Sequence, residues 1–274
     1  ALQWYDKADA PQALGKLISV GAITSLIVYA LLWVLLTLFS LDYVWIFLLA
    51  GSACCGLAAF MWVGFPRFEA EIEQTHTLVL RKRYWLFYAL QFLSGARRQI
   101  FMVFAAFLMV EKFGYSAAQV TTLFLINYAF NWLFAERIGS LIGRIGERKA
   151  LTIEYTGLVI VFTAYAFVEN PYIGAALYVI DHMFFALAIA IKTYFQKIAS
   201  PEDIASSAGV SFTINHIAAV VIPAALGLVW VVSNAAVFLV GTAFAACSLI
   251  LAQNIPARPI RGNEVNWIRV ESNA

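Results

Sequence analysis

Two adjacent arginines lie in the middle of a long apolar stretch. The stretch Tyr84–Val110 has 27 residues, with Arg97 and Arg98 at its midpoint, and a helix needs roughly 20 residues to cross a bilayer. A charge at the centre of a membrane helix costs at least about 2.5–3.5 kcal/mol on insertion scales. We therefore expect both guanidinium groups to face a water-filled cavity or a buried partner. There they would hold an anionic group, because guanidinium offers paired donors to a carboxylate or a phosphate.

Three further apolar stretches carry polar side chains near their centres. Asn127 and Asn131 are four residues apart, which places them on one helix face. The pairs Asp181–His182 and Asn215–His216 lie at a similar depth in two other stretches. Four helices thus carry polar groups within about two turns of one plane. We predict a substrate-binding layer formed by Arg97, Arg98, Gln99, Asn127, Asn131, Asn215 and His216.

Asp181 and His182 have the chemistry for proton transfer. Imidazole has an ordinary pKa of about 6.5, and intramembrane carboxyls and imidazoles are usual components of proton relays. We predict that this pair is a proton-coupling site. Static alternatives stay open: Asp181 could form an ion pair with Arg97 or Arg98, and the histidines and asparagines could be hydrogen-bonded packing residues between helices.

The composition indicates an integral membrane protein. Hydrophobic residues make up 62% of the 274 residues and charged residues 12%, with a mean hydropathy of +0.81, whereas a soluble domain has about 25% charged residues. The net charge of +2 gives no reason to expect a nucleic-acid partner. The three cysteines show no disulfide or metal-ligand spacing. No catalytic motif is present either, so we predict no enzyme activity, no cofactor and no metal.

The apolar runs predict an all-α protein with eight transmembrane helices. The predicted spans are residues 15–39, 41–65, 84–110, 117–138, 150–168, 172–199, 206–230 and 235–253. Residues 66–83 form a long polar connection that we interpret as an amphipathic linker, and residues 254–274 form a polar tail.

The basic residues are distributed unevenly between the two sets of helix ends. One set carries fourteen lysines and arginines, and the opposite set carries only Lys112. The positive-inside rule then places both termini in the cytoplasm, and we expect a bacterial inner membrane. The fourteen are Lys7, Lys16, Arg67, Arg81, Lys82, Arg83, Arg144, Arg148, Lys149, Lys192, Lys197, Arg258, Arg261 and Arg269.

The segment Gly139–Leu151, GSLIGRIGERKAL, resembles the cytoplasmic signature loop of the major facilitator superfamily. The family pattern is Gly, three residues, Asp, Arg, one residue, Gly, Arg, Arg or Lys, two residues and Leu. Gly143 stands where the family has Asp, and Glu147 where it has the first Arg of the pair. The positions that match are Gly139, Leu141, Arg144, Gly146, Arg148 and Leu151.

This resemblance implies two six-helix bundles around a midplane site with alternating access. Two spans, a linker and six more spans would be helices five to twelve of the family's twelve. Residues 1–65 would then be the last two helices of a partial first bundle, residues 84–253 a complete second bundle, and the first four helices a missing partner from the same protein. The resemblance implies a cytoplasmic gate formed by Gly139, Arg144, Gly146, Arg148 and Glu154, with Glu154 expected to pair with Arg144 or Arg148.

The sequence therefore predicts a secondary active transporter. Its substrate would be a small anionic or polar organic solute, moved by a facilitative or proton-coupled mechanism, and its other partners would be membrane lipids and protons. The alternative is a transporter-like protein that moves nothing and serves as an assembly factor or receptor for a partner complex. That alternative predicts central arginines closed off by Asp181 in a dry site.

Overall fold

The computed structural model describes residues 6–37, 42–64 and 80–267. Every long element in these ranges is a helix, and the one β contact there is an isolated bridge between Ile260 and Asn263. Seven helical segments of the described residues are long and apolar enough to cross a membrane. The predicted class, an all-α membrane protein, is confirmed. The linker interpretation for residues 66–83 falls mostly outside the described residues.

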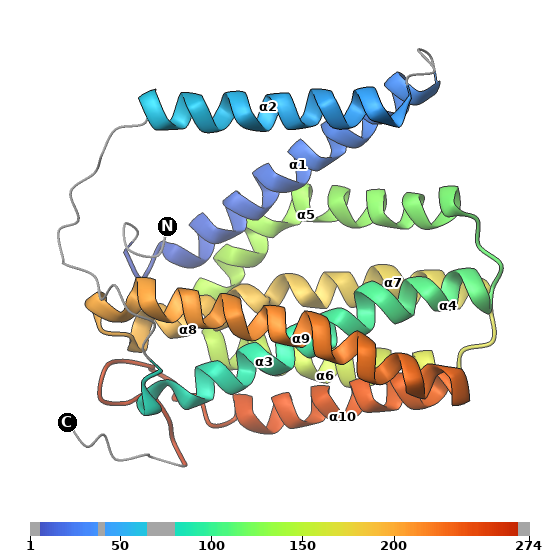
Figure 1. Cartoon of the computed structure of the whole chain (residues 1–274). Helices are drawn as coiled ribbons and strands as arrows, with labels where there is room; N and C mark the ends of the chain where they lie inside the picture. Colours follow the sequence, from blue (N-terminus) through green and yellow to red (C-terminus); the bar gives the residue numbers. More distant parts are fainter. Residues whose placement is uncertain (1–5, 38–41, 65–79, 268–274) are drawn as a thin grey trace.

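The first two helices lie to one side of the others. Helix α1 (Ala10–Thr37) runs diagonally across α5 (Ala117–Ile145), and α2 (Tyr43–Gly64) lies beyond α1 (Figure 1). Side chains along α2 are exposed, with Trp62 89% and Val63 86% accessible. An apolar helix with this exposure is suited to contact with lipid tails.

The remaining helices form a bundle of six long segments. The third predicted span is continuous through η1 (Lys82–Tyr84), α3 (Trp85–Gln99), the π-helix η2 (Ile100–Ala105) and α4 (Ala106–Glu111). The sixth predicted span comprises α7 (Pro171–Phe185), η3 (Ala186–Ala188) and α8 (Ile189–Ile198). The other segments are α5, α6 (Glu147–Phe167), η4 (Pro201–Asp203) with α9 (Ile204–Val232), and α10 (Asn234–Ala252).

Helix α5 departs from the sequence prediction in two ways. Its 29 residues are long enough to span a bilayer, yet it is not among the seven apolar segments, because Asn127, Asn131 and the pair Glu136–Arg137 lower its hydropathy. It also continues to Ile145, so most of the predicted loop 139–149 is helical. Gly146 separates α5 from α6 with a φ of 85°, a conformation that glycine adopts without steric cost.

Contacts between distant residues define the two ends of the bundle. At one end, where α1 begins and α10 ends (left in Figure 1), Lys197 pairs with Glu147 at 2.6 Å and Arg148 donates to Gln253. We call this the basic end. At the other end Lys112 pairs with Glu169 at 2.9 Å. Lys112 thus lies at the end opposite to Arg148 and Lys197.

Helices α1 and α5 cross with their backbones in contact. A Cβ atom added to Gly15 would lie 2.2 Å from the carbonyl oxygen of Ala135, and one added to Gly139 would lie 2.2 Å from that of Pro11. Gln12 also donates a hydrogen bond to Glu136 at 3.2 Å. The absence of side chains at these two glycines permits the close approach, as small residues do where membrane helices cross.

Gly15→Ala should weaken this crossing by about 1–3 kcal/mol, because the new methyl group overlaps a backbone that cannot move aside easily. Unfolding in detergent measures the effect. Gly21→Ala is the matched control on the same helix, since nothing lies within 4 Å of a Cβ there, and it should be neutral or stabilising by up to about 1 kcal/mol. Equal stability of the two variants would contradict the packing argument.

Candidate functional site

A cavity of about 550 Å³ lies between α1 and the six-segment bundle. Helix α3 contributes one face to it, with Gln91, Ser94 and Arg98 spaced by three and four residues. Leu14, Leu17 and Ile18 of α1 form an apolar wall. The cavity also receives residues from η2, α5, α7, η3, α8 and α9, so four of the six long segments of the bundle border it and the segments α6 and α10 do not.

The charges that line the cavity are all positive. Arg98 and Lys192 both belong to the lining, and no aspartate or glutamate does. Within the described residues, no carboxylate forms an ion pair with either of them. They also interact electrostatically with each other, as Arg98 does with His182. Like charges held together in a cavity create a strongly positive potential, which favours an anion.

A short 3₁₀ segment brings Lys192 to the cavity. Ten residues separate it from His182, and in an unbroken α-helix the two directions would differ by about 80°. The three residues of η3 advance about 120° each instead of about 100°, which reduces the difference to about 20°. His182 and Lys192 therefore face the same space. The sequence prediction counted Lys192 among the end charges, and its position in the fold corrects this.

Neutral polar groups complete the lining. Asn131 Nδ2 donates to His182 Nε2 at 2.8 Å, which places the proton of a neutral ring on Nδ1. Asn215 Nδ2 donates to the carbonyl of Ser211 at 3.0 Å, and its side chain lies against Gly95. Together with Gln91 and Ser94, these amides surround the cations with donors and acceptors suited to a polar solute.

Arg97 points away from the cavity into the bundle. Its side chain is fully buried and lies 3.8 Å from the carboxylate of Glu154, with the guanidinium 4.3 Å from the centre of the Tyr155 ring. Its Nε donates to the Leu93 carbonyl at 3.2 Å. Asp181, also fully buried, interacts electrostatically with both Arg97 and Glu154. We call Arg97, Glu154 and Asp181 the buried cluster.

The predicted polar layer thus divides into separate environments. Arg98, Asn131, His182 and Asn215 line the cavity, whereas Arg97 and Asp181 belong to the buried cluster. The other predicted members lie elsewhere: Gln99 and Asn127 are not part of the lining, and Asn127 is buried. His216 is exposed beside Phe212, whose carbonyl lies 2.9 Å from its Nδ1.

The predicted gate residues are also divided. Gly139 and Gly146 serve the helix crossing and the α5–α6 break, Arg148 bonds to Gln253 at 3.2 Å, and Arg144 is exposed. The sequence led us to expect that Glu154 would pair with Arg144 or Arg148, but among the described residues it pairs with neither. It lies seven residues along α6 from Glu147, about 10 Å further into the bundle, where Arg97 is its partner.

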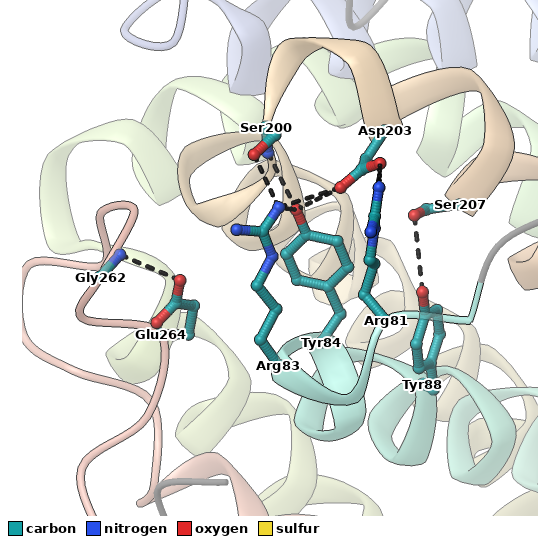
Figure 2. Close-up of polar contacts among 9 residues, drawn as sticks. All are labelled: Arg81, Arg83, Tyr84, Tyr88, Ser200, Asp203, Ser207, Gly262 and Glu264. Carbon is teal, nitrogen blue, oxygen red and sulfur yellow. Dashed lines mark hydrogen bonds and ion pairs between the residues drawn. The ribbon is translucent and has the colours of Figure 1, made fainter. Parts of the chain in front are cut away.

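Sequence reasoning missed the most connected carboxylate of the basic end. Asp203 is 1% exposed and accepts hydrogen bonds from Arg81, Arg83 and Tyr84 at 3.0–3.1 Å (Figure 2). Arg83 also donates to the hydroxyl of Ser200 at 2.7 Å. This clamp ties the start of α3 to the start of α9. The available signal was an acidic residue just after a proline at a helix start, opposite the three basic residues 81–83.

Comparison with known protein families gives a match over most of the chain. A model of the Major Facilitator Superfamily matches residues 1–223, which includes the α1–α5 crossing, the segment Gly139–Leu151 and every residue that lines the cavity. No curated protein matches the chain. Members of this family are transporters rather than enzymes. With more than half of its length matched and an all-helical fold built of apolar spans, the chain belongs to the major facilitator superfamily.

Proposed function

We propose that the protein is a secondary transporter that binds a small organic anion in the cavity between α1 and the bundle. The observation that carries the proposal is that two cations, Arg98 and Lys192, line the same cavity and that no carboxylate lines it with them. Two cations without a counter-charge are costly in a membrane protein, and a bound anion removes this cost. Guanidinium and ammonium groups together suit a carboxylate or a phosphate.

The rest of the lining supports an amphipathic organic solute. The lining combines apolar groups of α1 with polar groups of α3 and α5, and Phe101, Met102 and Phe185 add further apolar surface. Sites for small organic molecules have this character, with a few placed polar groups on a mainly apolar wall. Alternating access would expose the cavity to each side of the membrane in turn.

The finer features of the sequence prediction form part of the same proposal. The chain would correspond to helices five to twelve of the family fold, in a bacterial inner membrane with the basic end in the cytoplasm. Transport would be proton-coupled, with His182 at the cavity and Asp181 in the buried cluster. The non-transporting alternative predicts closed arginines: Arg97 is buried beside Asp181, whereas Arg98 is exposed within the cavity, and this exposure supports the transport proposal.

Arg98→Gln and Lys192→Gln should each weaken anion binding roughly 10- to 150-fold, since a hydrogen bond to a charged group contributes about 1.5–3 kcal/mol. Benzoate, succinate and glucose 6-phosphate are suitable probes, measured by thermal shift of the purified protein and by uptake into proteoliposomes, with glucose as the neutral comparison. Arg137→Gln is the matched control, because Arg137 is exposed on α5 outside the cavity lining. Unchanged binding in both cavity variants would contradict the proposal.

Cysteine accessibility tests whether the cavity is open to water. In a background without Cys54, Cys55 and Cys247, Ser94→Cys should react with small charged thiol reagents, and an anionic reagent should react faster than a cationic one of equal size. Ala96→Cys is the control on the same helix, since Ala96 is fully buried in the bundle and should not react. A cysteine at position 94 that reacts with neither reagent from either side of the membrane would favour the non-transporting alternative.

A further inference from the structure

The buried cluster contains more acid than base. Arg97, Glu154 and Asp181 are each 0% exposed, and they come from α3, α6 and α7. One guanidinium faces two carboxyl groups, so the cluster would carry a net charge of −1 with both acids ionised. An unbalanced charge in a low-dielectric interior is strongly unfavourable, and such a group neutralises instead.

No other described group supplies the balancing charge. The titratable side chains that interact with the cluster are tyrosines: Tyr155 and Tyr165 on α6 and Tyr178 on α7. These hydroxyls are neutral at physiological pH. The next cation, Arg98, faces the cavity, and Lys197 pairs with Glu147 at the basic end. The imbalance therefore belongs to the cluster itself.

The hydrogen-bond geometry agrees with the charge count. Among the described residues, neither carboxyl oxygen of Glu154 or of Asp181 accepts a hydrogen bond, and the Arg97 guanidinium lies over the Tyr155 ring. Two ionised carboxylates beside a guanidinium would each draw its N–H groups into short, charge-assisted bonds. The Arg97–Glu154 separation of 3.8 Å is longer than such a bond.

We propose that the buried cluster is a proton-binding site that holds one proton for the two carboxyl groups of Glu154 and Asp181 beside Arg97. The proton leaves the cluster neutral: one carboxylate balances the guanidinium, and the other carboxyl carries the hydrogen. The site differs from the predicted Asp181–His182 pair, because His182 lines the cavity and Asp181 does not, and the charged groups that interact with Asp181 are Arg97 and Glu154. Proton binding here deepens the proposed coupling without depending on transport.

Infrared spectroscopy of the purified protein tests this directly. At neutral pH the wild type should show the carbonyl-stretch band of a protonated carboxylic acid. Glu154→Gln and Asp181→Asn should each abolish it, because the remaining carboxyl then balances Arg97 and needs no proton. Glu147→Gln is the matched control: Glu147 is 2% exposed but has its own cation, Lys197, so the band should persist. A wild-type spectrum without the band, or a band that both single variants retain, would overturn the proposal.

Thermal stability provides a second, independent measurement. Each single variant should remain folded, with a melting temperature near that of the wild type, because its cluster stays neutral. The double variant leaves Arg97 buried without a counter-charge and should melt roughly 6–20 °C lower. A double variant as stable as the single variants, or two single variants as unstable as the double, would contradict a shared proton.

The pH dependence of stability has a definite sign. A proton held in the folded state but released on unfolding stabilises the fold at low pH, and this contribution declines as the pH rises. The wild type should therefore lose stability toward alkaline pH more steeply than either single variant. These measurements require no solute, so their failure leaves the anion cavity untouched, and failed anion binding leaves the proton site untouched.

Discussion

A guanidinium inside a membrane bundle needs either a counter-charge or water, and helix α3 must satisfy this requirement twice in succession. Consecutive residues on a helix point about 100° apart, so Arg97 and Arg98 cannot share one solution. Arg97 faces Glu154 and Asp181 within the bundle, and Arg98 faces the cavity. This division fixes the rotation of α3, and the rotation in turn determines that Gln91 and Ser94 belong to the cavity lining.

Helix α3 therefore connects the cavity with the buried cluster, because it contributes one arginine to each. The turn η1 just before α3 is held at the basic end by Asp203, which accepts bonds from Arg81 and Arg83. Immediately after the arginines, the wider π-helical turn η2 begins, a deviation that frequently occurs at functional sites. A segment clamped at one end and irregular just past its charges can transmit a change at the cavity to the buried cluster, because both guanidinium groups move with the same backbone.

The sequence was sufficient for the apolar spans other than α5 and for the expectation that the central arginines need partners or a cavity, because hydropathy and charge are local properties. It was insufficient for the site, where rotation and long-range contact decide. Nothing local tells which of two adjacent arginines faces inward. Glu154 is 57 residues from Arg97 in the chain, and Lys192 reaches the cavity only through the 3₁₀ turn η3. The predicted loop at Gly139 is helical as far as Ile145, because within residues 139–151 only Gly146 has a positive φ.

The contact of α1 with α5 continues well past Gly15. Ser19 donates a hydrogen bond to the carbonyl of Trp132, and the centre of the Tyr29 ring lies 5.7 Å from that of Tyr128. Two helices joined along this length should move as one unit. Because α1 and α5 both line the cavity, a displacement of this pair relative to α3 would change the width of the cavity and leave the glycine crossing intact.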